Sequence, residues 1–248
     1  MVQDLHSHTY YSYCGNDSPD ALIKTAIENG VEFLGISDHC HGVMTNYPTI
    51  KYGNDDIRIL MSRVALQRYY DHIMTVAYKY RDYIKVWCGL EITTIDHGYY
   101  TVPEECFDFS LFDYCFIENI EKPESTIDDL FAFKNRLGCK VCGLPHIDLP
   151  AYIRSKNEDM ESFFKKMAEN NIFWELNVHP AKEGNGNEQE YVDRFFTDEE
   201  VISAVKKSGL TMSVALDCHN VATYDGNRLK ETCRKLEELK IPMVMYGK

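Results

Sequence analysis

Residues 4–9 read Asp4-Leu5-His6-Ser7-His8-Thr9 (DLHSHT), and the fold predicted for the whole chain starts from this stretch. Successive side chains of a strand point to opposite faces, so His6 and His8 project from the same side. Two imidazoles held side by side are suitable ligands for one metal ion. The stretch therefore predicts a first strand over residues 2–8 that carries two candidate metal ligands.

The same combination, an apolar strand that ends in polar side chains, recurs along the chain. Further strands are predicted over residues 32–38, 84–92, 112–117, 141–144, 172–178 and 211–216. Helices are predicted between them, from Ser18-Pro19 to Asn29-Gly30 and over residues 54–81, 126–137, 158–170, 197–207 and 227–239. Thr197 with Glu200 forms a predicted capping box for the fifth helix. Residues 180–196 are polar and contain several Gly and Asn, which predicts an irregular loop.

Seven strands that alternate with helices predict a parallel sheet with right-handed crossovers. The length of 248 residues fits one core, and no composition break indicates a linker. No Gly-rich phosphate loop follows the first strand, which favours a closed barrel over an open doubly wound sheet. We therefore expect an α/β barrel formed by residues 1–248 as a single domain, with the functional side chains at the C-terminal ends of its strands.

The composition disfavours several classes of partner. The formal net charge is −13 and the pI is near 5.1, and no basic stripe is evident, so a nucleic-acid partner is not expected. No stretch approaches the roughly 18 apolar residues of a membrane span. The start, MVQDLHSHT, has no export signal, and the nine cysteines are an odd count. Reduced thiols in the cytoplasm are therefore expected. We make no prediction of the oligomeric state.

Seven side chains lie at or just beyond the ends of predicted strands, so a barrel would bring them to one mouth. They are His6, His8, His39, Glu91, His146, Asp217 and His219. Mixed imidazole and carboxylate ligation suits Zn, Mn or Fe, and a carboxylate such as Glu91 can bridge two ions. Several ions in one mouth would activate water and hold phosphoryl oxygens, which indicates a hydrolytic site.

The remaining histidines are predicted to be less directly involved. His72 lies within the long helix and His97 in a loop, and we expect a structural or surface role for both. His41 and His179 lie near strand ends without a paired partner, and they are left unassigned.

Six short motifs in chain order resemble those of the PHP family, named for polymerases and histidinol phosphatases. They are DLHSHT, GISDH ending at His39, GLE ending at Glu91, PHIDL around His146, WELN around Glu175 and ALDCH ending at His219. PHIDL is similar to the histidinol-phosphate phosphatase branch in particular. The resemblance covers nearly the whole chain. It implies a distorted TIM-like (βα)7 barrel of the PHP type with a trinuclear metal centre that hydrolyses phosphoesters.

The resemblance also implies a ligand set for three metal sites. One site would use His6, His8, Glu91 and Asp217, a second Glu91 and His146, and a third His39 and His219. This chain has Cys14, with Asp17 close by, where many members have a third early histidine, and either residue could ligate. It has Glu118-Asn119 where the family usually has another histidine. Glu118 is our predicted replacement, and the alternative is a weakened or empty second site.

The function expected from these residues is metal-dependent hydrolysis of a small phosphomonoester by metal-activated water. Two or three divalent ions (Zn, Mn or Fe) would be the cofactors, Asp217 and His219 would be catalytic, and histidinol phosphate is a candidate substrate. Arg154 resembles a basic residue that phosphatase members carry after this motif, and Arg228 is a second candidate cation for phosphate. A solvated surface arginine is the alternative for each. For an ammonium group on the substrate, Asp148, Glu175 or another acidic residue could serve.

Two other functions fit part of the pattern. An amidohydrolase-type barrel, which cleaves C–N bonds, also opens with HxH, but the Asp217-x-His219 pair fits the phosphoesterase pattern better. A non-catalytic metal-binding domain would keep the barrel and lose the second site through the changes at Glu118 and Asn119.

Overall fold

The computed structural model describes residues 1–45, 55–94, 108–120, 126–179 and 188–246. Its strands form one seven-stranded sheet in the order β1 to β7, with every neighbouring pair parallel. The strands are β1 (Gln3–Asp4), β2 (Phe33–Ile36), β3 (Lys85–Thr93), β4 (Tyr114–Glu118), β5 (Cys142–Leu144), β6 (Ile172–Asn177) and β7 (Met212–Ala215). The seven predicted parallel strands are thus confirmed.

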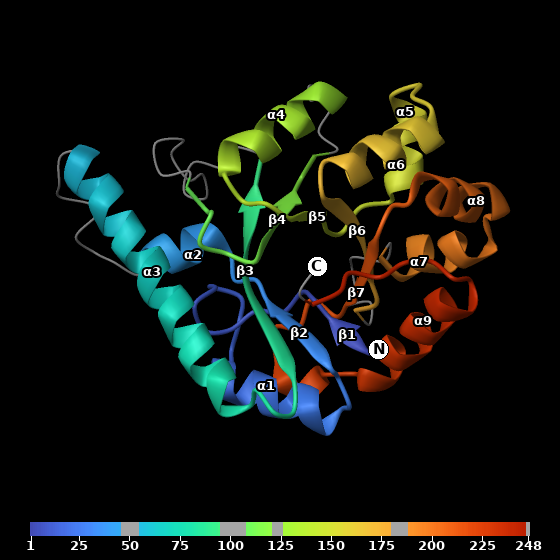
Figure 1. The fold of residues 1–248 in the computed structure, drawn as a ribbon. Coiled ribbons are helices and arrows are strands. Elements are labelled where there is room, and N and C mark those ends of the chain that lie inside the picture. Colours follow the sequence, from blue (N-terminus) through green and yellow to red (C-terminus); the bar gives the residue numbers. More distant parts are fainter. Residues whose placement is uncertain (46–54, 95–107, 121–125, 180–187, 247–248) are drawn as a thin grey trace.

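The two ends of the sheet meet, so the sheet is a nearly closed barrel. The backbone N–H of Leu5 donates to the carbonyl of Val214 at 3.2 Å, and Ser7 forms a parallel bridge with Cys218. These contacts join the chain after β1 to the chain after β7. Figure 1 shows the strands at the centre and helices α1, α3, α4, α6, α8 and α9 around the outside. This is the TIM-like arrangement that the alternating pattern predicts.

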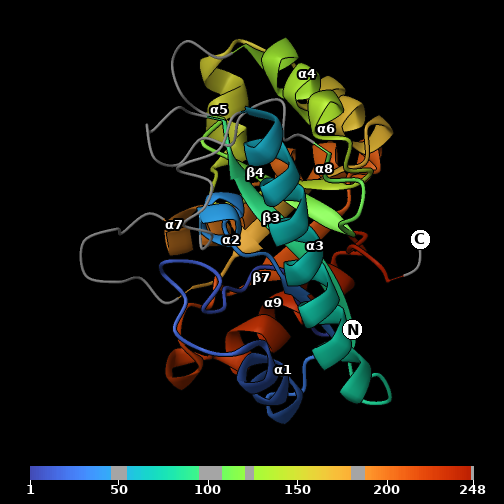
Figure 2. The same cartoon turned by 90° about the vertical axis from the view of Figure 1, so that its left-hand side faces the viewer.

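The helices begin largely where side chains cap them. The helices are α1 (Pro19–Glu28), α2 (Cys40–Thr45), α3 (Asp55–Lys79), α4 (Ile127–Leu137), α5 (Leu149–Ser155), α6 (Met160–Glu169), α7 (Glu188–Thr197), α8 (Glu199–Ser208), the 3-10 helix η3 (Val221–Thr223) and α9 (Gly226–Glu238). Ser18 caps α1, and Thr126 with Asp129 forms a capping box on α4. The long helix α3 lies against β3 (Figure 2).

Three helices, α2, α5 and α7, are absent from the sequence-based prediction. The predicted loop over residues 180–196 is wrong from residue 188 onward, where α7 begins, and residues 180–187 lie outside the described part of the chain. Contact with the sheet explains α7, because Tyr191 stacks on the buried Trp174 of β6. Thr197 ends α7, so the predicted cap is also wrong, and the side chain of Asp198 caps α8 instead. The predicted start of the long helix, Asn54, is not described.

Aromatic rings fill the inside of the barrel. Phe33, Trp87, Tyr114, Phe116 and Phe173 form one buried cluster with Leu5 and Val244, separate from the larger core between the strands and the helices. Glycines on neighbouring strands leave room for these rings. A Cβ atom added at Gly89 would lie 2.4 Å from the Tyr114 ring, and one added at Gly143 would lie 2.4 Å from the Phe173 ring. No helix in the part of the chain that the structure describes is long and apolar enough to cross a membrane.

Candidate metal centre

Two imidazoles and two carboxylates meet at the C-terminal end of the barrel. The Nε2 atoms of His6 and His8 lie 3.1 Å apart, and Nε2 of His8 lies 3.0 Å from Oδ1 of Asp217. Oε2 of Glu91 lies 3.4 Å from both imidazole Nε2 atoms. His6 and His8 follow β1, Glu91 lies on β3, and Asp217 follows β7, so the barrel brings together residues that are far apart in the chain.

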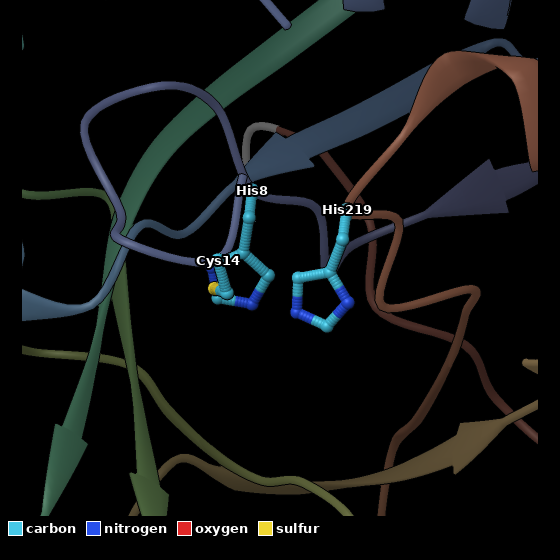
Figure 3. Close-up of side chains that lie close together, drawn as sticks. All are labelled: His8, Cys14 and His219. Atoms are coloured by element: carbon cyan, nitrogen blue, oxygen red, sulfur yellow. The ribbon is translucent and has the colours of Figure 1, made fainter. Parts of the chain in front are cut away.

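A second group of donors adjoins the first through the same two carboxylates. Nδ1 of His39 lies 3.0 Å from Oε2 of Glu91, and Nε2 of His219 lies 3.4 Å from Oδ1 of Asp217. Cys14, in the loop after β1, has its sulfur within 4.8 Å of ring nitrogens of His8 and His219. Figure 3 shows these three side chains gathered at one place. Glu91 thus lies between the His6–His8 pair and His39, where a bridging carboxylate would be needed.

The candidates for a further site are His146 and Glu118. Nε2 of His146 lies 3.6 Å from Oε1 of Glu91 and 3.6 Å from Oδ2 of Asp217. Nδ1 of His146 lies 3.0 Å from the amide nitrogen of Asn177, whose Oδ1 accepts the backbone N–H of His179. This amide therefore presents its NH₂ to Nδ1, which puts the proton of a neutral His146 on Nε2. Glu118 ends β4 but joins none of the close donor groups found among the described residues.

Two of the candidate ligands have a backbone conformation that side chains other than glycine adopt rarely. The φ angle is 54° at His146 and 49° at Asp217. Such left-handed residues cost on the order of 1 kcal/mol each and cluster at functional sites. The turns after β5 and β7 thus hold strained residues whose side chains enter the cluster.

The opposite charges in the cluster shift its proton affinities. Burial opposes protonation of His6, but Glu91, Glu175 and Asp217 outweigh it and raise the pKa of His6 well above its ordinary value. Burial opposes ionisation of Glu91, but the imidazoles of His6 and His39 outweigh it and lower its pKa. His6 and His146 likewise hold the pKa of Asp217 well below its ordinary value against burial. The metal-free cluster thus attracts positive charge.

At the edge of the cluster the pKa shifts have the opposite effect and favour neutral forms. Burial lowers the pKa of His39 to about 4. Burial and the nearby Glu91 raise the pKa of Glu118 to about 8. Burial and the carboxylates of Asp217 and Glu91 raise the pKa of Cys14 to about 12. Without a bound cation, Cys14 is therefore a thiol and Glu118 is mostly a neutral acid near pH 7.

The donor set fits divalent metal ions. Ligand atoms about 2.1 Å from a tetrahedral ion lie about 3.4 Å from one another. The separations in the cluster, 3.0 to 3.6 Å, match this spacing. Oε1 of Glu91 and Oδ1 of Asp217 are buried and accept no hydrogen bond within the described structure, even though Oδ1 lies 3.0 Å from Nε2 of His8. Buried oxygens that lack a proton donor are suited to a cation.

A comparison with known protein families agrees with this geometry. A family model described as "PHP domain" matches residues 4–179 of this chain. The chain belongs to the PHP domain family. The matched range includes His6, His8, His39, Glu91 and His146, and it ends before β7, so the contribution of Asp217 and His219 rests on their positions in the structure.

Individual relatives of this PHP domain are distant. A protein named "Probable phosphatase" from Acetivibrio thermocellus is 26% identical over 251 residues, which covers 98% of this chain and 88% of that protein. The crystal structure of histidinol phosphate phosphatase from Lactococcus lactis, complexed with Zn, L-histidinol and phosphate, is 15% identical with a TM-score of 0.63 and covers 98% of this chain and 95% of that chain. The putative histidinol phosphatase of Listeria monocytogenes is 12% identical with a TM-score of 0.54 and covers 89% and 96%. At these identities the two structures show a shared fold.

Two other predicted residues of the PHP domain, Arg154 and Asp17, have partners elsewhere. Arg154 lies on α5, where its half-exposed guanidinium donates to Asp198 and Glu200 at 3.2 Å each. The ion pairs of the described cluster join histidine and carboxylate and include no arginine or lysine. Oδ2 of Asp17 accepts the backbone N–H of Val221.

Arg228 is the second candidate cation for phosphate, and His72 is the helical histidine for which we expect a structural or surface role. Arg228 pairs with Asp225. Nδ1 of His72 lies 2.8 Å from the Tyr11 hydroxyl. His97 lies outside the described residues.

The histidines left unassigned lie beside the cluster. The ring of His41 stacks on that of His39 with centroids 5.2 Å apart, and the ring of His179 lies 6.4 Å from that of His219.

Sequence reasoning missed the side chains that orient the donors. Nδ1 of His6 lies 2.8 Å from Oε1 of Glu175, and Nδ1 of His8 lies 3.1 Å from the Ser12 hydroxyl. Asp38, buried beside His39, accepts hydrogen bonds from Ser12. The one available signal was Glu175 itself, a carboxylate inside the fully buried strand IFWELN. Ser12 and Asp38 give no such signal, because both residue types are common in loops.

Proposed function

We propose that this PHP domain is a metal-dependent phosphomonoesterase that acts on a small phosphorylated substrate, with histidinol phosphate as the first candidate. The observation that carries the proposal is the position of Glu91, whose Oε2 lies within 3.4 Å of nitrogens of His6, His8 and His39. A carboxylate so placed suits a centre of two or more ions. The names of the relatives support the same activity, since one is a probable phosphatase and one is a histidinol phosphate phosphatase complexed with Zn, L-histidinol and phosphate.

In this proposal each group of donors holds one ion. His6, His8, Glu91 and Asp217 would hold the first. Glu91 would share a second with His39, His219 and Cys14. His146 and Glu118 would hold a third, which is the weakest site because His146 must give up its Nε2 proton and Glu118 its acid proton. Bound divalent cations would lower the pKa of a water molecule and neutralise the charge on phosphoryl oxygens.

Exposure distinguishes the side chains that would touch substrate from those that would only ligate. The side chains of His6, His8 and Glu91 are at most 1% exposed, whereas those of Asp217, His219 and His146 are 13%, 21% and 25% exposed. Substrate would therefore approach over these last three residues. The Asp217 carboxylate would orient the attacking water and accept its proton. When the third site holds no ion, the Nε2–H of His146 would instead donate a hydrogen bond to a phosphoryl oxygen.

The charge of the cluster makes the proposed activity strictly dependent on cations. A phosphate monoester carries negative charge, and the cluster presents Glu91, Asp217 and Glu175 to it. Arg154 is the predicted phosphate cation, but its guanidinium already binds Asp198 and Glu200. Its role in phosphate binding stays a prediction and would require that these carboxylates release it.

The experiment that tests the function measures metal and turnover in one preparation. Elemental mass spectrometry gives the ions per chain, and phosphate release is followed with histidinol phosphate and a panel of phosphomonoesters. We expect two or three ions and release of phosphate. His8→Ala and Asp217→Ala should abolish turnover while circular dichroism stays unchanged. His72→Ala, which removes a histidine outside the cluster, should keep both metal and turnover.

Two results would contradict the proposal. One is at most one ion per chain and no release after Mn or Zn is added back, which would favour a non-catalytic domain. The other is full turnover in His8→Ala or Asp217→Ala.

A further inference from the structure

The hydroxyl of Ser12 lies among three polar groups: one from each of the two donor groups, and a third from Asp38. It is 2.7 Å from Oδ1 of Asp38, 2.8 Å from the backbone N of His39 and 3.1 Å from Nδ1 of His8. Ser12 is 3% exposed and Asp38 is fully buried, so water does not replace these contacts. The number of protons on each group therefore determines which group donates and which accepts.

The proton between Ser12 and Asp38 belongs to the serine. Oδ1 of Asp38 also accepts the backbone N–H groups of Thr9 at 2.7 Å and Ser12 at 3.1 Å. Two N–H groups that point at Oδ1 leave no place for a proton on that oxygen, whatever the charge of the carboxyl group. A serine hydroxyl has one proton and two lone pairs. Ser12 therefore donates to Asp38 and acts as an acceptor toward its other two partners.

The ring of His8 then has one compatible neutral form. One lone pair of the Ser12 oxygen accepts the backbone N–H of His39. The other faces Nδ1 of His8, and because two acceptors do not form a hydrogen bond, Nδ1 carries the proton. Nε2 of the neutral ring is unprotonated and lies 3.0 Å from Asp217 and 3.1 Å from His6.

We infer that Ser12, held by Asp38, is a positioning residue that sets His8 in the Nδ1–H tautomer and ties the backbone of His39 to the same oxygen. The Ser12 hydroxyl thus keeps the Nε2 lone pair of His8 available in the first donor group. It also holds the backbone of His39, which belongs to the second donor group. The geometry of both groups exists before an ion binds. The consequence for catalysis rests on the function proposed above, whereas the tautomer is a property of the chain alone.

The wild-type tautomer is tested without metal or substrate. In metal-free, ¹⁵N-labelled protein at pH 8, long-range ¹H–¹⁵N NMR spectra separate protonated from unprotonated ring nitrogens, and His8→Gln assigns the signals. We expect His8 to show a protonated Nδ1 and an unprotonated Nε2. A protonated Nε2 in the wild-type protein would overturn the inference, and this measurement needs no variant of Ser12 to fold.

Substitution then tests whether Ser12 is the cause. Ser12→Ala should populate the Nε2–H form of His8 and weaken zinc binding by about 10- to 100-fold, measured by competition with a chelator. Ser12→Thr, which restores a hydroxyl, should recover most of that affinity. The matched control is Ser7→Ala, because the Ser7 hydroxyl donates to Asp4 instead. An unchanged His8 tautomer and zinc affinity in a folded Ser12→Ala protein would show that Ser12 does not set the ring. An equal loss in Ser7→Ala would show a general packing effect and would also overturn the inference.

Discussion

Nδ1 of His6 lies 2.8 Å from Oε1 of Glu175, a residue 169 positions later in the chain. The other oxygen of Glu175 accepts the backbone N–H of His146 at 3.2 Å. One buried carboxylate on β6 thus orients the first histidine of the centre and anchors the strained residue after β5. Partners of this kind fix the ring orientation of metal-ligating histidines and raise their basicity.

Removing this carboxylate should weaken metal binding. We expect Glu175→Gln to lower zinc affinity by roughly tenfold, because the neutral amide keeps one hydrogen bond to His6 and loses the charge that supports it. Glu175→Ala should cost more, and it should also destabilise the fold by about 1–3 kcal/mol because buried donors lose their acceptor. Zinc titration and urea unfolding measure the two effects. Glu169→Gln, on the exposed surface of α6, is the control, and equal zinc affinity in all three variants would contradict the argument.

Local patterns in the sequence predicted the framework of this site. The predicted closeness of the His6 and His8 rings agrees with Nε2 atoms 3.1 Å apart, although β1 ends at Asp4 and both histidines follow the strand instead of lying in it. The strand ends predicted where Glu91 and Asp217 would lie, because parallel strands bring their carboxyl ends to one mouth. Helix α1 could be predicted from Ser18-Pro19 because caps are local signals.

Contacts between distant residues account for what the sequence did not predict. Helix α7 depends on the packing of Tyr191 against Trp174, and no local signal marks that contact. The orienting roles of Glu175 and Ser12 depend on partners that only the closed barrel brings near. The left-handed backbone of His146 has no sequence signal either, since few residues other than glycine adopt it.

Glu118 provides a test of the third site through proton release. Its pKa of about 8 means that the metal-free protein holds most of this proton at pH 7. An ion that binds Glu118 must displace the proton, so metal binding should release it below pH 8 and should release less as the pH rises above 8. Isothermal titration calorimetry in buffers of different ionisation enthalpy counts the protons. Glu118→Gln should release about one proton fewer at pH 7, and the same count as in the wild type would exclude Glu118 as a ligand.

Asp4 should make stability depend on pH in the metal-free protein. Burial raises its pKa to about 6 although Tyr224, Leu216 and Ser7 donate hydrogen bonds to it. The folded state keeps this proton at pH values where the unfolded chain has released it. The stabilisation is therefore complete below about pH 4 and is lost as the pH rises through 6, by up to about 3 kcal/mol.

Comparison with Asp4→Asn isolates this effect from other titrating groups. As the pH rises from 4.5 to 7, the wild type should lose more free energy of unfolding than Asp4→Asn, as measured by urea unfolding. A difference that stays constant over this range would mean that Asp4 has an ordinary pKa.

Gly143 leaves room inside the barrel for two phenylalanine rings, and one of these rings packs against His6. A Cβ atom there would lie 2.4 Å from the ring of Phe173 and 2.5 Å from that of Phe116, and the Phe116 ring stacks on the imidazole of His6 with centroids 4.5 Å apart. We expect Gly143→Ala to destabilise the fold by about 1–3 kcal/mol through overpacking and to lower zinc affinity through displacement of His6. Because Phe173→Leu removes part of the clash, the double variant should be more stable than the sum of the two single effects implies. Urea unfolding and zinc titration of the four proteins complete the cycle, and strict additivity would mean that Gly143 and Phe173 do not share this space.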